Sequence, residues 1–327
     1  MGPRIVDIRQ LGAKQFQPLL QAESRAWLDD IHWDYAPSAE LISTYLEEKR
    51  LSGYALVEEG CAKGYCLYFR EGSKGLIGSL FVEPVDSRAD RAAALLSKTI
   101  DALASLPDVN RIEAQLPHFS LEQIGPYFRS RAFQVYLRQF MTYRLGIRPE
   151  NRQPPPSQPE RSRPMAKPSS DFLFVPWERK YDREAGQLLH HVYRNHIDAA
   201  VNDQYCTVTG TMRLVESIAR HRGCGDYLQY ASVAAIHRST RKLAGILGLT
   251  AVRPGTAHIP QIAVATGFQG LGLGSGMLRS SFEKLEREGF SEVSLTVTTL
   301  NSGAVRLYER LGFRTFREFG AFVWNQP

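Results

Sequence analysis

The pattern of apolar and polar positions divides the second half of the chain into alternating strands and helices. Short apolar runs are typical of buried strands, whereas apolar residues spaced three and four apart are typical of one helix face. On this basis strands are predicted at residues 172–177, 230–237, 242–252, 257–265 and 292–300, and helices at residues 183–197, 210–221, 277–289 and 301–312. Residues 313–324 are predicted to close the chain as a hairpin that turns at Gly320.

Pro260 interrupts one of these predicted strands, residues 257–265. Proline has no N–H group to donate to a ladder, so within sheets it is confined to edges, to bulges or to places where strands separate. We therefore expect an edge, a bulge or a strand separation at this point.

A proline-rich segment at residues 148–170 divides the chain in two. It holds seven of the eighteen prolines and no aromatic residue, so it cannot bury enough surface to fold. The sequence predicts two domains, residues 1–147 and 171–327, joined by this linker.

The composition is that of a soluble globular protein, with 43% hydrophobic and 23% charged residues and a net charge of +6. The basic residues are dispersed, so a nucleic-acid partner is not favoured. No apolar run is long enough to span a membrane, and the start of the chain has no signal core, which favours a cytoplasmic protein. The four cysteines have no CxxC spacing, so we expect reduced thiols and no bound metal.

Four glycines fall within eight residues, QGLGLGSG at 269–276, where a predicted strand is followed by a helix. The first N–H groups of a helix have no partner within it, and the helix dipole adds positive potential. Glycines allow an anion to approach these donors, as in turns that bind pyrophosphate. A turn required only for tight packing is the alternative, because GxGxG alone is a weak signal. A Walker A loop is excluded, since no GK[ST] follows.

Two motifs in this half resemble the GNAT superfamily of N-acetyltransferases. The acetyl-CoA-binding motif of that family is met by Gln269, Gly272 and Gly274, and the second signature by Asn301, Ala304 and the run LYERLGF at residues 307–313. The resemblance covers residues 171–327 and implies an α/β (α+β) fold, with a mixed, mostly antiparallel sheet whose central strands are splayed and flanked by helices. The family often has proline and an acidic residue where this chain has Thr266 and Gly267, neither of which is expected to contact the phosphates.

The resemblance also implies binding roles. The backbone of Ile262, Ala263 and Val264 is expected to pair with the pantetheine arm of acetyl-CoA. Asn301 and Ala304 are expected to line its far side. The backbone N–H groups of the loop are expected to hold the pyrophosphate, and they belong to Gln269, Gly270, Leu271, Gly272, Leu273, Gly274 and Ser275.

Tyr308 is the predicted general acid. A phenol near the sulfur can protonate the departing thiolate, and the alternative is a tyrosine packed in the core. His258 is the best-placed titratable group for a general base, although a solvated histidine at a strand end is the alternative. The nearest acidic candidates lie in the helical region that usually walls the acceptor site in this family: Asp198, Asp203 and Asp226.

The first half carries a diverged copy of the same pattern. When Val82 is laid on Val264, the run YFRSRAF at residues 127–133 falls near LYERLGF, and Phe128 takes the place of Tyr308. Predicted helices at 37–50 and 91–106 and a strand at 53–59 fit the same order. The copy has Ser87, Asp90 and Ala92 in place of Gln269, Gly272 and Gly274. We therefore expect a tandem GNAT protein whose first domain is degenerate, binds no acetyl-CoA tightly and shapes the acceptor cleft.

The sequence thus favours an enzyme that transfers an acetyl group from acetyl-CoA to a primary amine of a small molecule or a protein by direct attack. A non-catalytic acyl-CoA sensor is the alternative, and a homodimer is left open. Aminoacyl-tRNA-dependent tandem GNAT proteins are disfavoured, because they generally lack the pyrophosphate loop. Fold alone does not identify the acceptor.

Overall fold

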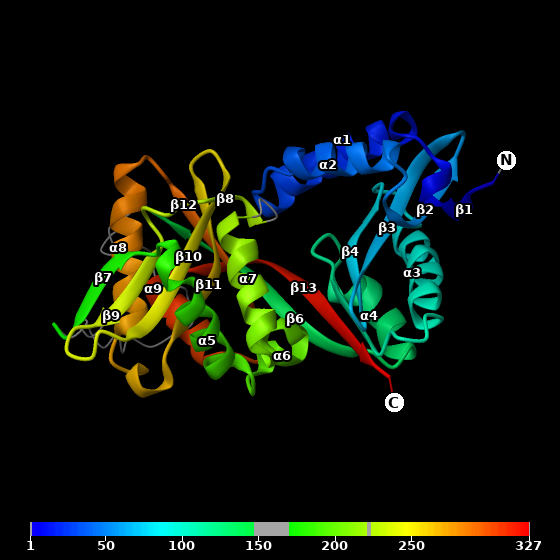
Figure 1. Cartoon of the computed structure of the whole chain (residues 1–327). Coiled ribbons are helices and arrows are strands. Elements are labelled where there is room, and N and C mark those ends of the chain that lie inside the picture. Colours follow the sequence, from blue (N-terminus) through cyan, green and yellow to red (C-terminus); the bar gives the residue numbers. More distant parts are fainter. Residues whose placement is uncertain (1, 147–169, 221–223, 327) are drawn as a thin grey trace. The chain divides into compact units, whose positions relative to one another are not determined.

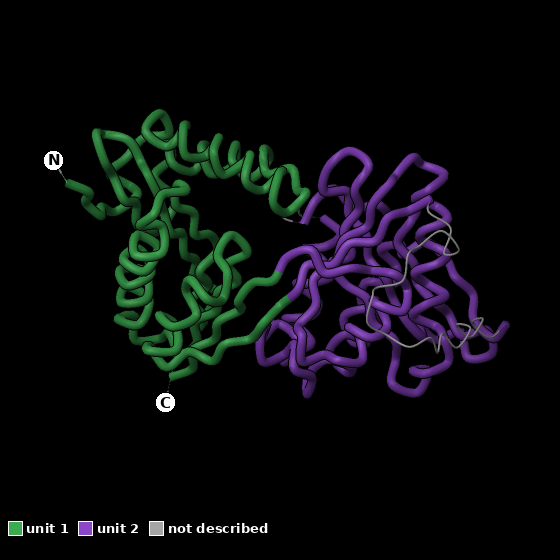
Figure 2. Tube along the Cα trace, turned by 180° about the vertical axis from the view of Figure 1, so that it is seen from behind, with its two compact units in different colours: residues 1–138, 318–327 green, residues 139–317 purple. Residues whose placement is uncertain are grey.

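The computed structural model describes residues 2–146, 170–220 and 224–326 (Figure 1). The chain forms two compact units, coloured separately in Figure 2. Unit 1 consists of residues 1–138 and 318–327, and unit 2 of residues 139–317. The predicted linker at residues 148–170 lies, apart from its last residue, outside the described residues.

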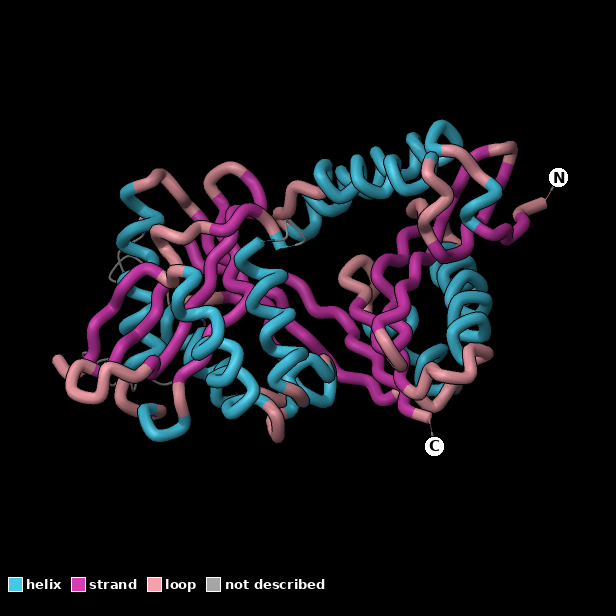
Figure 3. The backbone as a smooth tube through the Cα atoms, in the orientation of Figure 1, coloured by secondary structure: helices cyan, strands magenta, loops and turns pink. Residues whose placement is uncertain are grey.

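Unit 1 alternates strands and helices (Figure 3). Its strands are β1 (Arg4–Asp7), β2 (Ser52–Glu58), β3 (Cys61–Glu71), β4 (Lys74–Val82), β5 (Arg111–Gln115) and the first part of β6 (Gln134–Arg144). Its helices are η1 (Ile8–Gln10), α1 (Ala13–Ile31), α2 (Ala36–Glu47), α3 (Arg88–Ala104) and α4 (Leu121–Ser130). One core contains residues from α3 and α4 and another contains residues from α1 and α2, so helices cover both faces of the sheet.

Unit 2 repeats this order. Its strands are β7 (Phe172–Pro176), β8 (Asp226–Tyr227), β9 (Val233–His237), β10 (Leu243–Arg253), β11 (Thr256–Val264), β12 (Glu292–Thr298) and the first part of β13 (Arg314–Asn325). Its helices are η3 (Arg179–Tyr181), α5 (Asp182–Tyr193), α6 (Ile197–Val201), η4 (Asp203–Cys206), α7 (Val208–Arg220), η6 (Thr266–Phe268), α8 (Leu273–Arg287) and α9 (Ser302–Leu311). The predicted mixed α/β architecture is confirmed.

Alternating residues of the unit 2 strands enter opposite cores, as the pleat of a strand requires. Ala234 and Ile246 pack with α5 and α7, whereas their neighbours Val233 and Leu247 pack in the core that contains α8. The near-continuous apolar runs in the sequence follow from this burial on both faces.

The two units separate their central strands at equivalent residues. The parallel ladder of β4 with β5 ends at Ile77↔Ala114, and that of β11 with β12 ends at Ile259↔Leu295. Both endpoints lie five residues before the valines aligned from sequence, Val82 and Val264. This register supports the internal repeat.

The prediction that residues 313–324 form a hairpin turning at Gly320 is wrong. Residues Arg314–Asn325 form the single strand β13. A Cβ atom at Gly320 would lie 2.2 Å from the ring of Phe322, so this glycine makes room for an aromatic ring and does not form a turn. The ring of Phe322 in turn stacks on Phe128, with ring centroids 3.7 Å apart.

The last strand of each sequence half contributes to the other unit. Ala321–Asn325 of β13 pair antiparallel with Arg111–Gln115 of β5, inside unit 1. The end of β6 belongs to unit 2, where Met141 lies in the core with Leu295 of β12. The predicted domains, residues 1–147 and 171–327, differ from the compact units in these two segments.

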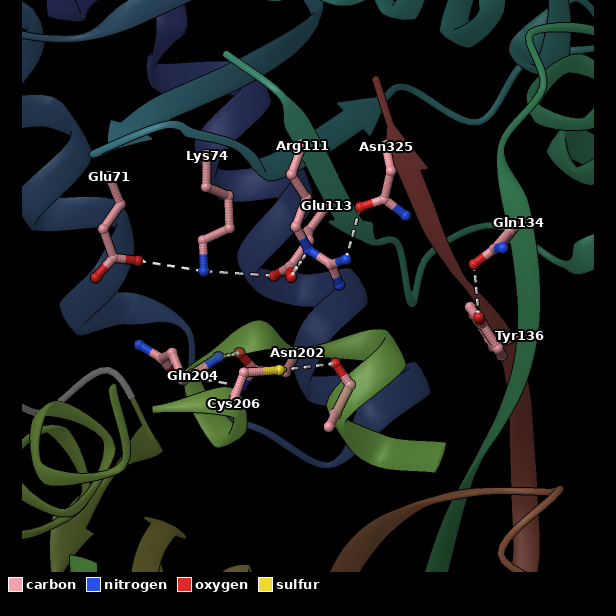
Figure 4. Close-up of polar contacts among 11 residues, drawn as sticks. Glu71, Lys74, Arg111, Glu113, Gln134, Tyr136, Asn202, Gln204, Cys206 and Asn325 are labelled. Atoms are coloured by element: carbon pink, nitrogen blue, oxygen red, sulfur yellow. Dashed lines mark hydrogen bonds and ion pairs between the residues drawn. The ribbon is translucent and has the colours of Figure 1, made fainter. Parts of the chain in front are cut away.

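Buried ion pairs join β4 to β5 in unit 1, and one of their members contacts the end of β13 (Figure 4). Lys74 Nζ lies 3.5 Å from Glu113 Oε2, and Arg111 Nε lies 2.6 Å from Glu113 Oε1. Arg111 Nη1 also donates to Asn325 Oδ1 at 2.9 Å. The charges compensate each other, which a buried carboxylate requires.

A second buried carboxylate in unit 1, Glu23 of α1, has hydroxyl partners. Tyr65 Oη donates to Glu23 Oε2 at 2.5 Å, and Ser79 Oγ donates to Oε1 at 3.3 Å. Burial raises the pKa of Glu23 to about 7, against the opposing effect of these hydrogen bonds. The folded state therefore binds a proton here more tightly than the unfolded chain does.

Replacing Glu23 with glutamine should reduce the loss of stability between pH 5 and pH 8. The folded pKa is raised, so the stability held by the protonated form is present near pH 4.5 and is lost as pH rises through about 7. The loss in the native protein amounts to about 3 kcal/mol by pH 8. Urea unfolding at both pH values measures it, with Glu40→Gln on the exposed face of α2 as the control. An equal pH dependence in Glu23→Gln and in the native chain would contradict this assignment.

Candidate functional site

The site in unit 2 begins where β11 leaves β12. Their parallel ladder runs from Thr256↔Glu292 to Ile259↔Leu295, and Pro260 follows directly. Residues 261–264 continue to pair with β10 on the other side. The strand separation that Pro260 suggested is therefore present.

The peptide groups of Ile262 and Val264 face this separation. Val264 is opposite Gly245 on β10, and the N–H of Ala265 donates to the Ala244 carbonyl at 2.8 Å. Hydrogen-bonded pairs alternate along an antiparallel ladder, so Ala263 also bonds to β10 while Ile262 and Val264 point away from it. Each of their carbonyls accepts from a side chain: Tyr193 Oη donates to Ile262 O at 2.8 Å, and Gln269 Nε2 donates to Val264 O at 3.1 Å.

The glycine loop leads from β11 into α8. Gly270 and Gly272 have φ values of +77° and +76°, a left-handed conformation that glycine adopts without strain. Gly272 is the N-cap of α8 and provides no side-chain cap, and the N–H of Gly276 makes the first helical bond, to the Gly272 carbonyl at 2.9 Å. The N–H groups of Leu273, Gly274 and Ser275 precede that bond, so they form the donor-rich start of the helix.

The helix α9 carries the second group of predicted residues. Asn301 is its N-cap, and its Oδ1 accepts from the N–H of Ala304 at 3.3 Å. The Asn301 Nδ2 atom donates to Asp198 Oδ2 at 3.5 Å, so this amide is directed toward α6. The structure brings Asn301 and Ala304 together at the start of the helix that carries Tyr308.

Tyr308 is buried near a carboxylate. Its ring lies 5.6 Å from that of Phe313, centroid to centroid. Burial, and then the charge of Asp198, raise the pKa of Tyr308 well above the usual value of a phenol. This environment therefore favours the protonated form of the hydroxyl.

His258, the predicted general base, is a buried residue in the paired part of β11. It lies opposite Ser294 of β12, and its Nδ1 is 2.9 Å from Ser294 Oγ. It is four residues before Ile262 along the strand.

The helical region that the sequence suggested as the acceptor wall also contains two tyrosines that were not found from sequence, Tyr193 of α5 and Tyr205 of η4. Tyr193 and Tyr205 stack with ring centroids 4.6 Å apart, and Tyr205 Oη donates to Gln261 Oε1 at 2.7 Å. These tyrosines contact β11 across sequence separations of more than fifty residues, and no local motif marks them.

Residues 226–313 match the model of the acetyltransferase (GNAT) family. The matched segment contains β11, the glycine loop, α8, β12 and α9, the elements that build the site. These residues form a GNAT acetyltransferase domain. No curated protein sequence matches the chain.

Solved structures show that the GNAT-like fold extends over the whole chain. A GNAT N-acetyltransferase from Sphaerobacter thermophilus is 14% identical, with a TM-score of 0.68, over 100% of this chain and 96% of that one. A tandem GNAT protein from the clavulanic acid biosynthesis pathway is 16% identical, with a TM-score of 0.61, over 99% and 98% of the two chains. At these identities the likeness concerns the fold, which is that of two GNAT-like domains in tandem.

In unit 1 the carbonyl at the equivalent strand position also accepts a hydrogen bond from a side chain. Arg88 Nε donates to the Val82 carbonyl at 3.1 Å, and its guanidinium lies 4.6 Å from the ring centroid of Phe119. Asp90 places a negative charge in the first turn of α3. Phe128, at the position of Tyr308, is fully buried.

No helix in the described ranges is long and apolar enough to cross a membrane. The same residues contain no group of three or more His, Cys, Asp or Glu side chains that could hold a metal ion.

Proposed function

We propose that unit 2 is an acetyl-CoA-dependent N-acetyltransferase that acts on a primary amine. The observation that carries the proposal is the arrangement of β11 and α8: a strand whose outer peptide groups face a separation in the sheet leads through a glycine loop to an uncapped helix start. The strand offers amide partners to an extended chain such as pantetheine, and the helix start offers N–H donors to a pyrophosphate.

The residues of the chain fit acetyl-CoA in three places. Ile262 and Val264 present gap-facing peptide groups, with Ala263 between them bonded to β10. The backbone of the loop from Gln269 to Ser275 would hold the phosphates, and Gly274 leaves ordinary contact distances of 3.8 Å to Val264 and 4.0 Å to Leu307 for an added Cβ. Asn301 and Ala304, at the start of α9, would flank the pantetheine.

In the proposed reaction acetyl-CoA supplies the activated thioester, and attack by the neutral amine nitrogen on its carbonyl carbon breaks the C–S bond. Tyr308 donates its proton to the departing sulfur, and its burial keeps it protonated until that moment. His258 is the proposed acceptor of the amine proton, by way of water, because it is the titratable side chain on β11. A sensor that binds acyl-CoA without turnover is the second candidate, and the Tyr308 variant described in the Discussion separates the two.

Unit 1 is proposed to bind no acetyl-CoA. Asp90 would repel a pyrophosphate at the start of α3.

An acetylation assay with a panel of amines, read by mass spectrometry, tests the activity. The panel should include glucosamine, because one structural neighbour is named as a fungal glucosamine N-acetyltransferase region; it is 12% identical, with a TM-score of 0.61, over 99% of this chain and 38% of that one. Calorimetry on the same protein should give one acetyl-CoA per chain. A stoichiometry of two would overturn the proposal for unit 1, and absence of binding would overturn the function as a whole.

A further inference from the structure

Two tyrosines beside β11 in the unit 2 site, Tyr193 of α5 and Tyr205 of η4, already donate their hydroxyl protons. Tyr193 Oη donates to the Ile262 carbonyl at 2.8 Å, and Tyr205 Oη donates to Gln261 Oε1 at 2.7 Å. A phenol that donates its proton in this way can interact with a further group only by accepting a hydrogen bond. Ile262 is also where β11 has left β12, so the Tyr193 oxygen lies at the strand separation.

A carboxylate belongs to the same cluster. Asp198 Oδ1 accepts from Thr298 Oγ1 at 2.7 Å, Oδ2 lies 3.2 Å from His196 Nδ1, and the side chain is 19% exposed. Its charge acts on both Tyr193 and Tyr308, raising the pKa of each together with the larger effect of burial. Neighbouring side chains link Asp198 to both tyrosines: Asn301 of α9, the helix that carries Tyr308, donates its Nδ2 to Asp198 Oδ2 at 3.5 Å, and the ring of His196 lies 5.3 Å from that of Tyr193.

These groups have the chemistry of an ammonium site. An ammonium ion has three N–H donors and no acceptor, and it is attracted to carboxylates and to the faces of aromatic rings. The Tyr193–Tyr205 stack, with centroids 4.6 Å apart, provides the rings, while Tyr193 and Asp198 provide acceptor oxygens.

We infer that Tyr193 and Asp198 dock the ammonium group of the acceptor amine, with Tyr193 accepting one of its N–H groups and Asp198 compensating its charge. The inference rests on the proposed function for the identity of the reaction, but the binding itself needs no turnover. A site of this kind favours acceptor amines that are cationic in solution and disfavours neutral arylamines.

The simpler account is that Tyr193 only protects the free edge of β11. A hydroxyl that covers the Ile262 carbonyl would then compete with acetyl-CoA, and its removal would change cofactor affinity but not amine affinity. The two accounts therefore predict changes in different ligands.

The test uses two cations of equal charge, phenethylammonium, which has three N–H donors, and phenethyltrimethylammonium, which has none and is larger by three methyl groups. Calorimetry on the full chain saturated with CoA measures their affinities without turnover. The variants are Tyr193→Phe and Asp198→Asn. Tyr227→Phe is the matched control, since Tyr227 also donates its hydroxyl to a backbone carbonyl, that of Trp177, at 2.9 Å. Asp182→Asn is the second control, since its carboxylate accepts from Trp177 Nε1 at 3.1 Å.

Tyr193→Phe should weaken phenethylamine about tenfold and leave the trimethyl cation unchanged, because only the amine donates a hydrogen bond. Asp198→Asn should weaken both cations about tenfold, because both carry the charge. Neither control should change either affinity by more than about twofold.

Three results would overturn the inference. One is failure of both cations to bind at millimolar concentration, and another is unchanged affinity in both site variants. The third is a Tyr193→Phe variant in which only the affinity for acetyl-CoA changes, which would mean that Tyr193 only covers the Ile262 carbonyl. Cation binding that follows the expected pattern in a protein without acetylation activity would uphold the site and overturn only the proposed function.

Discussion

Replacement of Tyr308 by phenylalanine should lower kcat by about 10²–10³-fold while acetyl-CoA affinity stays within about twofold. The ring and its contact with Phe313 remain, and only the proton donor is lost. Solvent can protonate a thiolate, so the expected loss is in the lower part of the range for acid–base catalysis. Steady-state kinetics with any amine identified in the panel measures it.

The pH profile provides a second readout for the same variant. Donation requires a protonated phenol, and burial together with Asp198 raises the pKa of Tyr308 above its usual value. The acetylation rate of the native protein should therefore decline only at a more alkaline pH than the ordinary pKa of tyrosine would give. In the Tyr308→Phe variant this alkaline decline should be absent. Tyr143→Phe is the control, since the Tyr143 ring lies 5.3 Å from the same Phe313. A Tyr308 variant with nearly full kcat would assign the residue to packing.

Replacement of Gly272 by aspartate should lower the affinity for acetyl-CoA at least about tenfold, or ~1.4 kcal/mol in binding free energy. The substitution puts a negative charge at the N-cap of α8, where the proposed phosphates meet the first N–H groups. In the sequence alignment of the two halves it also reproduces Asp90, which lies in the first turn of α3. Calorimetry on folded protein gives the change directly.

The control for Gly272→Asp is Gly289→Asp, after the other end of α8. Both glycines have a left-handed backbone, with φ of +76° and +81°, so any strain from the new side chain is matched. An added Cβ at Gly289 meets no atom within 4 Å. Equal losses of affinity in the two variants would mean that backbone strain, and not charge at the loop, is responsible.

Much of unit 2 could be predicted from sequence because its signals are local. The glycine loop, the helix that begins after Asn301 and the strand separation at Pro260 each depend on a few neighbouring residues, and the structure contains all three features. The proposed roles of these residues toward acetyl-CoA stay predictions.

The features that sequence could not give depend on distant partners. Tyr193 reaches Ile262 across 69 positions, and Asp198 reaches Thr298 across 100. The error at Gly320 has a related cause: a glycine between apolar residues suggests a turn, but this one makes room for the ring of Phe322, which stacks on a residue of the other sequence half. Periodicity describes each strand and cannot say which unit the strand joins.

The route of β6 and β13 has a consequence for how the protein can be divided. A gene cut at the proline-rich segment would give one fragment with β6 but without residues 318–327, and a second with β13 but without residues 139–147. Each fragment alone would lack a strand that its core contains, with Phe322 missing from one and Met141 from the other. The two halves are thus suited to behave as a split protein, insoluble or unfolded when produced separately and restored by co-production. A tandem chain whose halves exchange strands in this way needs both halves to fold, whichever of them holds the ligand site.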